Sequence, residues 1–186
     1  MLKLQFTEKN NITNKFNSGL FLFAAVFIAL SLRLYDVSNR PLHNDEAVNT
    51  IKFKSLLEQN DYKYNPIEYH GPTLYYATLV AAWVSGASNF EDLYEKIIRG
   101  IPIFSSLLLF LALFTLRKNL STISLIVITL FLIISPYVNF YSRYYIHESL
   151  LVTFTFFMII TFFNFYNTSK IYWIILSGIS AGLLFA

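Results

Sequence analysis

The sequence predicts an all-α, multi-pass membrane protein with about five transmembrane helices. Hydrophobic residues make up 55% of the 186 residues, charged residues make up only 13%, and apolar stretches recur along nearly the whole chain. The mean hydropathy is +0.51. A bilayer crossing takes about 20 mostly apolar residues, and lipid cannot satisfy an open strand edge, so the spans are expected to be helices.

Five apolar stretches are the expected spans, and they leave room for a single membrane domain over residues 1–186. They are Ser18–Leu34, Ile101–Leu116, Leu120–Val138, Ser149–Tyr166 and Ile171–Ala186. No small-residue cleavage site follows the first stretch, so we interpret it as an uncleaved anchor. The last stretch reaches the end of the sequence with no charged stop. We therefore expect this chain to be the N-terminal part of a longer protein.

Basic residues set the expected orientation, because short loops rich in Lys and Arg stay on the cytoplasmic side. The N-terminal lysines, the Arg117-Lys118 turn and Lys170 are the clearest cases. We expect a plasma-membrane protein with a cytoplasmic N-terminus, and with Tyr35–Arg99 and Asn139–Glu148 on the outer face. The 14 basic residues are scattered, which argues against nucleic acid as a partner, and the absence of cysteine excludes disulfides and thiol chemistry.

The first outer loop is expected to contain helices that lie along the membrane. Pro72–Gly86 is apolar but short and rich in hydroxyl groups, so it is expected at the interface rather than across the bilayer. The sequence from Ser88 to Glu91 has the pattern of a capping box, and apolar residues then recur at helical spacing up to Ile98. A second surface helix is therefore expected to lead into the span at Ile101.

An acidic pair in the first outer loop is one of two candidate functional sites. Asp45 and Glu46 are adjacent, and His43 precedes them by two residues. The simplest interpretation is structural, with Asn44 or Asp45 capping a helix over 46–58 and the carboxylates favouring its positive end. The alternative is catalytic, because a carboxylate at the membrane surface can act as a general base.

The second outer loop is the other candidate site. It holds Ser142, Arg143, His147 and Glu148 between two strongly apolar spans. Interfacial anchoring by the arginine and neighbouring tyrosines explains part of this composition. The number of ionisable groups exceeds what anchoring needs, and polar groups at membrane depth usually line a site or a pathway. His70, at the start of the apolar segment 72–86, is a further candidate for binding an anionic phosphate.

Taken in order, these motifs resemble the C-type integral-membrane glycosyltransferases that use lipid-phosphate sugars, the superfamily of protein O-mannosyltransferases and aminoarabinose transferases. The likeness is closest to the prokaryotic branch described as flippase-associated or dolichyl-phosphate-mannose-protein mannosyltransferase-like, and it covers the N-terminal part of such enzymes. It implies that Asp45 and Glu46 are catalytic. It maps the family's His-Gly-Pro element onto His70 and its second-loop acid onto Glu148, where many relatives have Asp.

The resemblance implies transfer of a sugar from a polyprenyl-phosphate donor to an acceptor hydroxyl, with inversion, on the extracytoplasmic face. Asp45 is then the base, and His70, Arg143, His147 and Glu148 bind substrate. Because adjacent carboxylates disfavour joint ionisation unless a cation intervenes, a divalent metal shared by Asp45 and Glu148 stays open. The partners are the lipid donor, membrane lipid and an acceptor of unknown identity. The alternatives are a noncatalytic subunit, or a flippase or transporter component, of a glycan assembly pathway.

Overall fold

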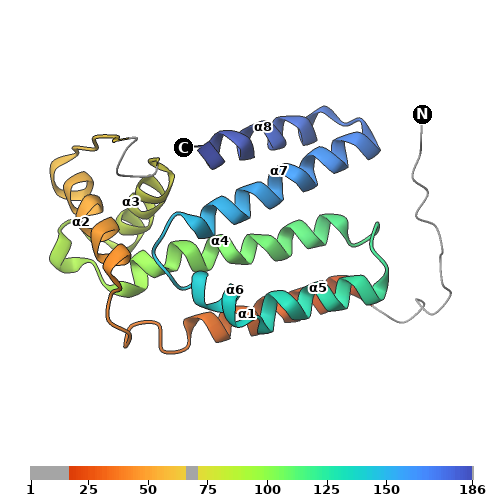
Figure 1. Cartoon of the computed structure of the whole chain (residues 1–186), viewed down its shortest axis with the longest axis horizontal. Helices are drawn as coiled ribbons and strands as arrows, with labels where there is room; N and C mark the ends of the chain where they lie inside the picture. The colour runs from red at the N-terminus through yellow and green to blue at the C-terminus, as the bar shows by residue number, and fades with distance from the viewer. Residues whose placement is uncertain (1–16, 66–70, 186) are drawn as a thin grey trace.

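The computed structural model describes residues 17–65 and 71–185, and helices are the regular secondary structure of this part of the chain (Figure 1). The prediction of an all-α fold is thereby confirmed for these residues. The α-helices are α1 (Ser18–Leu34), α2 (Asn44–Gln59), α3 (Thr73–Ser85), α4 (Glu95–Leu116), α5 (Thr122–Ile134), α6 (Pro136–Tyr141), α7 (Glu148–Thr168) and α8 (Ile171–Phe185). A short 3₁₀ helix, η2 (Phe90–Asp92), precedes α4.

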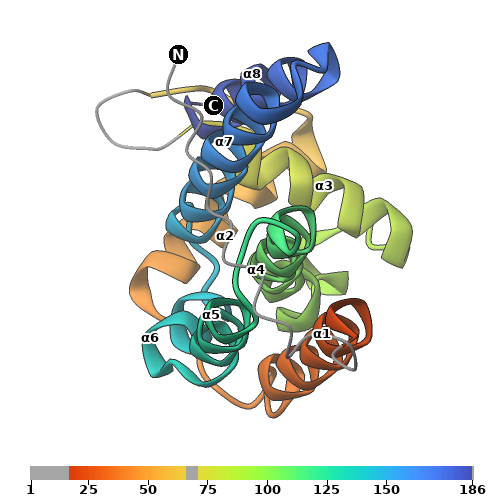
Figure 2. The same ribbon diagram turned by 90° about the vertical axis from the view of Figure 1, so that its right-hand side faces the viewer.

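The long helices lie side by side in a bundle, with α4 packed between α1 and α7 and with α8 against α7 (Figures 1 and 2). Small side chains of α1, Ala25 and Ala29, are fully or almost fully buried against Phe110 of α4 and Ile133 of α5. Leu113 of α4 belongs to a second buried cluster of the same three helices. Three of the apolar stretches that the sequence predicts as spans therefore contribute to one bundle core.

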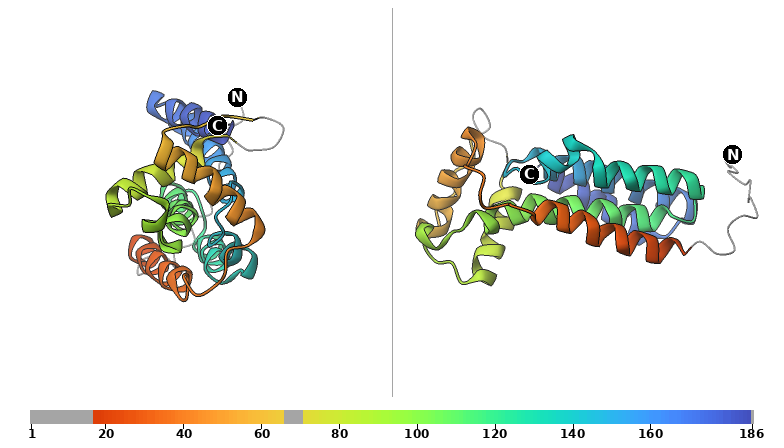
Figure 3. Two further views of the ribbon diagram at one scale, coloured as in Figure 1. Left: turned by 90° about the vertical axis from the view of Figure 1, so that its left-hand side faces the viewer. Right: turned by 90° about the horizontal axis from the view of Figure 1, so that it is seen from below.

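Helices α2 and α3 lie across one end of the bundle rather than along it (Figure 3). Their shared core joins Phe53 and Leu56 of α2 to Tyr75, Leu79 and Ala82 of α3. The crosswise arrangement is the one expected of helices that lie along a membrane surface. It agrees with the expectation that the segment 72–86 does not run parallel to the spans.

The opposite end of the bundle carries the basic connections. The start of α1, the turn between α4 and α5, and the turn between α7 and α8 all lie there (Figure 1). Those two turns hold Arg117, Lys118 and Lys170. The arrangement puts these basic side chains at one end, as the sequence predicts, whereas the N-terminal lysines lie outside the described residues.

The expectation of about five spans is not confirmed. Two described helices, α4 with 22 residues and α7 with 21, are long and apolar enough to cross a membrane by length and composition. The apolar helices α1, α3, α5 and α8 have 17, 13, 13 and 15 residues. Each is shorter than the roughly 20 residues that a helix normal to the bilayer needs.

The predicted span Leu120–Val138 is wrong as one continuous helix, because the chain breaks at Ser135. Pro136 disfavours helical geometry in the residue before it, and Ser135 has φ −58° and ψ 121°. The Ser135 hydroxyl then accepts a hydrogen bond from the Val138 amide, at 3.5 Å, and caps the short helix α6. The Ser-Pro pair in the sequence is a signal that could have revealed this break.

The boundaries around α4 also differ from prediction. The prediction of one second surface helix that leads into the span is wrong, because a break at Leu93 and Tyr94 separates η2 from α4. Helix α4 begins at Glu95. The expected capping residues are shifted by one position: the Asp92 carboxylate accepts from the amides of Ser88 and Asn89 at 3.4 and 3.3 Å. The span predicted from Ile101 thus starts six residues earlier, within the crosswise end of the molecule.

Large apolar side chains cover much of the outer surface of the bundle. Phe23 and Phe27 of α1 are exposed, as are Ile123 of α5, Ile159 of α7 and Ile175 of α8. Soluble monomers rarely present contiguous apolar patches larger than a few hundred Å². Such a surface suits contact with lipid tails, in agreement with the composition.

Candidate functional site

Two loops that are about a hundred residues apart in the sequence meet at the end of the bundle that carries α2. The Tyr145 amide donates to Oε1 of Glu46 at 3.1 Å, and Asn49 of α2 donates to the Tyr145 carbonyl at 3.1 Å. Arg40 donates through Nη2 to the Arg143 carbonyl at 3.2 Å. The acidic pair and the arginine-containing loop therefore form one continuous region.

Glu46 is the buried centre of this region. Its carboxylate accepts from Arg99 at 3.0 and 3.1 Å and from Arg40 at 2.9 and 3.0 Å. The amides of His43 and Tyr145 add one hydrogen bond each. Burial alone raises the pKa of this carboxyl, but the hydrogen bonds from Arg99, His43 and Tyr145 outweigh burial and hold the pKa below its ordinary value.

Arg99 ties the first turns of α4 to the loop before α2. Besides binding Glu46, its Nη1 donates to the Val37 and Arg40 carbonyls at 2.6 and 2.9 Å, and its Nη2 donates to the Pro41 carbonyl at 3.1 Å. Arg99 and Glu46 are both fully buried. A guanidinium fork suits such multiple bonding, and removing one partner of a buried pair costs about 3–5 kcal/mol.

Asp45 is the accessible member of the acidic pair. Its side chain is 63% exposed, and its Oδ2 lies 3.7 Å from Nδ1 of His43. The His43 ring lies 5.2 Å from the ring of Tyr144 in the second loop. The structure also makes His43 the N-cap of α2, so the expectation that Asn44 or Asp45 caps this helix is wrong. The Asp45 carboxylate is therefore open to solvent, whereas both oxygens of Glu46 accept hydrogen bonds from within the protein.

Ser142 and Arg143 connect the second loop to α1. Arg33, a fully buried residue of α1, donates through Nε to Oγ of Ser142 at 3.0 Å and through Nη2 to the Leu132 carbonyl at 2.9 Å. Arg143 donates through Nη2 to the Tyr35 carbonyl at 2.6 Å. The serine thus has a structural partner, and the arginine has one main-chain partner.

The remaining predicted residues are spread more widely. His147 is buried, with Nε2 lying 3.0 Å from the Gly71 carbonyl and with its ring 5.2 Å from the ring of Tyr75, so it joins the second loop to the start of α3. Glu148 is exposed at the first position of α7. His70 lies outside the described residues.

The described residues contain no group of three or more His, Asp or Glu side chains placed to hold a metal ion. A divalent cation shared by Asp45 and Glu148 therefore stays a prediction from the sequence.

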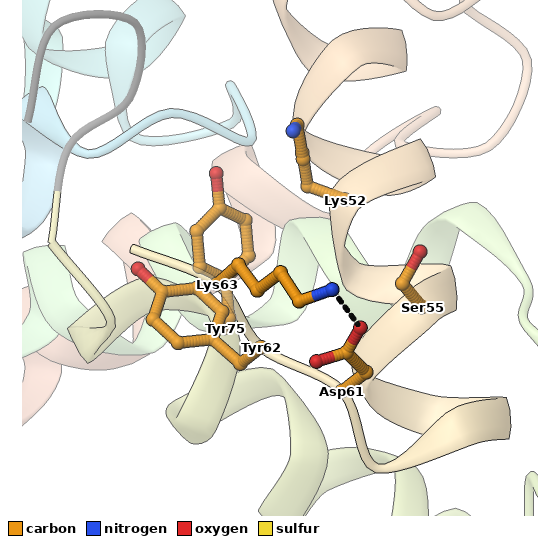
Figure 4. A pocket seen from close by; sticks show the side chains of 6 residues that line it. All are labelled: Lys52, Ser55, Asp61, Tyr62, Lys63 and Tyr75. Atoms are coloured by element: carbon orange, nitrogen blue, oxygen red, sulfur yellow. Dashed lines mark ion pairs between the residues drawn. The ribbon is translucent and has the colours of Figure 1, made fainter. Parts of the chain in front are cut away.

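A separate cavity of about 150 Å³ lies between α2, α3 and the segment after α2 (Figure 4). Lys63 and Asp61 form an ion pair across 3.3 Å at its edge. Its lining residues are Lys52, Ser55, Asp61, Tyr62, Lys63 and Tyr75. Tyr75 connects this cavity to the Asp45 region, because its hydroxyl donates to Oδ1 of Asn49 at 2.8 Å.

Sequence reasoning missed three arginines that organise the site, Arg33, Arg40 and Arg99. An arginine inside or beside an apolar stretch is the signal in the sequence that could have revealed them, because a buried charge needs partners.

Comparison with known protein families, with curated proteins and with solved structures finds no match to this chain.

Proposed function

We propose that this protein is a multi-pass membrane glycosyltransferase that moves a sugar from a polyprenyl-phosphate donor to an acceptor hydroxyl on the extracytoplasmic face of the plasma membrane. The observation that carries the proposal is the contact between the two loops, which brings the segment of the exposed Asp45 to the segment of Arg143. Transfer at an anomeric carbon needs a base for the acceptor proton and a cation for the departing phosphate. These two residues supply both.

In the proposed reaction, the acceptor oxygen attacks the anomeric carbon on the face opposite the phosphate, and the configuration inverts. Asp45 takes the hydroxyl proton as the new carbon–oxygen bond forms. The bond between the anomeric carbon and the phosphate oxygen breaks, and the polyprenyl phosphate leaves with the electron pair. Arg143 holds the negative charge of that phosphate through its guanidinium fork.

Glu46 acts as a positioning residue in this proposal, because its oxygens are already occupied by two arginines and two amides. It fixes the first turn of α2, which carries Asp45, against the loop that carries Arg143. His147 supports the second loop from α3, and Glu148 and His70 are the remaining candidates for contact with the sugar or its phosphate. Apolar outer faces of the helices suit the lipid tail of the donor.

A noncatalytic subunit of a glycan assembly pathway is the second candidate function. It is favoured by the high exposure of Asp45, since ligand sites are commonly concave and enclose most of the ligand. A flippase or transporter path predicts ionisable groups deep within spans. Arg33 and Arg99 are buried in α1 and α4, but each lies within a few residues of a helix end and is bonded to the two loops.

The Asp45→Asn variant tests the proposal. In membranes containing the full chain, we expect transfer from a panel of polyprenyl-phosphate sugars to fall by about 100-fold or more, the typical contribution of a general base. Thermal stability is expected to stay unchanged, because Asp45 is exposed and the His43 ring beside it is exposed as well.

Glu91→Gln is the matched control, since Glu91 is an exposed acid at the same end of the molecule. It is expected to transfer sugar as the wild type does. Wild-type turnover by Asp45→Asn would refute the assignment of the base. Failure of the wild type to use any donor of the panel would favour the noncatalytic subunit.

A further inference from the structure

Positive charge exceeds negative charge at the buried centre of the site. The guanidinium groups of Arg40 and Arg99 share the single carboxylate of Glu46, and Arg143 donates to a main-chain carbonyl. Arg40 and Arg143 are adjacent, because Arg40 reaches the Arg143 carbonyl at 3.2 Å. With Asp45 counted, three guanidinium groups and two carboxylates still leave a net positive region that attracts an anion.

Arg40 has N–H groups that are available for further hydrogen bonds. All of its hydrogen bonds to the described residues leave from Nη2, two to Glu46 and one to the Arg143 carbonyl, so Nε and Nη1 have no partner within that part of the chain. Its side chain is 33% exposed. The guanidinium carbon lies 5.1 and 5.7 Å from the ring centres of Tyr144 and Phe140, which hold it in place.

Arg143 has the same property. Its bond to the Tyr35 carbonyl uses Nη2, and Nε and Nη1 have no partner among the described residues. The side chain is only partly buried. Two neighbouring arginines, each anchored by one nitrogen and each with further N–H groups available, have the donor set that binds a phosphate group well.

We propose that Arg40 is a second phosphate-binding residue, which acts with Arg143 on the phosphate of a lipid-linked donor. The inference rests on the proposed function for the identity of the phosphate as that of a polyprenyl phosphate. Arg40 also binds Glu46, so the residue that contacts the phosphate is fixed to the helix that carries Asp45. The leaving group and the base are thereby held in a set relation before the acceptor enters.

Binding without turnover tests this proposal. Purified full chain in nonionic detergent is titrated with farnesyl phosphate, with farnesol as the neutral counterpart and with inorganic phosphate as the free anion. We expect farnesyl phosphate to bind most tightly of the three. Arg40→Gln and Arg143→Gln are each expected to raise the Kd for farnesyl phosphate by about tenfold or more, which is the effect of losing one charged hydrogen bond.

Arg117→Gln is the matched control. Arg117 also donates to a main-chain carbonyl, that of Phe114, but it lies at the opposite end of the bundle. Its Kd for farnesyl phosphate is expected to stay within about twofold of the wild type. Arg40→Lys keeps a cation beside Glu46, so it is expected to fold even if Arg40→Gln does not. Because lysine lacks the guanidinium fork, Arg40→Lys is also expected to bind farnesyl phosphate more weakly than the wild type.

Wild-type binding by both Arg40→Lys and Arg40→Gln would overturn the proposal, as would equal affinity for farnesyl phosphate and farnesol. Inorganic phosphate that binds as tightly as farnesyl phosphate would overturn the assignment to a lipid-linked phosphate. Intact binding of farnesyl phosphate without any sugar transfer by the wild type would refute the proposed function and leave the arginine site standing.

Discussion

The two ends of the helical bundle use basic side chains in opposite ways. At the end that carries α2 and α3, Arg33 and Arg99 are fully buried and donate to a carboxylate, a hydroxyl and several carbonyls. At the other end, Lys118 and Lys170 are exposed in short turns, and neither forms an ion pair with a described residue. One end uses charge to join segments, and the other leaves it in solvent.

This difference shows that a basic residue at the end of an apolar stretch can have either of two roles, which its position in the sequence alone does not distinguish. A lysine or arginine in a short turn can set membrane orientation without any specific partner. An arginine near a helix end that faces a loop must instead satisfy its donors inside the protein. Mutations at the two ends are therefore expected to have very different consequences.

The largest effect on folding is expected from Arg99→Gln. It leaves the buried Glu46 without its main partner and frees three carbonyls of the 37–41 loop. Removing one member of a buried pair costs about 3–5 kcal/mol. The measurement is the free energy of unfolding in detergent, with Lys118→Gln as the control at the opposite end. A similar loss of stability in both variants would contradict the contrast between the ends.

A smaller loss is expected from Ser142→Ala, which removes the hydroxyl that accepts from Nε of Arg33. A buried donor left unsatisfied costs about 1–3 kcal/mol. Ser124→Ala is the control, because Ser124 is exposed near the start of α5, and it is expected to change stability by no more than about 0.5 kcal/mol. Equal melting temperatures for the two variants would show that the Arg33 contact does not stabilise the fold.

The smallest effect is expected from acidification towards the ordinary pKa of a glutamate. The pKa of Glu46 is lowered in the folded protein, so the unfolded chain binds more protons in this range. The stability contributed by this group is therefore fully present above the ordinary pKa and is lost only as the pH falls through the lower, folded pKa. Thermal melting across this range checks it, and Glu46→Gln is expected to abolish this part of the acid sensitivity. A loss that sets in well above the ordinary pKa would contradict the prediction.

The sequence carried most information where periodicity and composition decide the structure. The apolar stretches are helices, the basic turns lie at one end of the bundle, and the two polar segments around Asp45 and Arg143 meet. The break at Ser135 is not predicted, because the stretch Leu120–Val138 is apolar almost throughout and only the Ser135-Pro136 pair indicates that the helix ends there. The different environments of Asp45 and Glu46 could not be read from their adjacency, because they depend on helical phase and on arginines from distant segments.

The break before α6 has a consequence for the surrounding lipid. The 13 residues of α5 rise only about 20 Å, whereas the hydrocarbon core of a bilayer is about 30 Å thick. In a membrane, a helix that is too short is accommodated by local thinning of the bilayer or by snorkelling of flanking residues. If α5 crosses the bilayer, as the proposed function requires, thinning beside α6 would bring the headgroup plane closer to Arg40 and Arg143. The anionic lipid proposed as donor would then reach the two arginines without lifting its tail out of the leaflet.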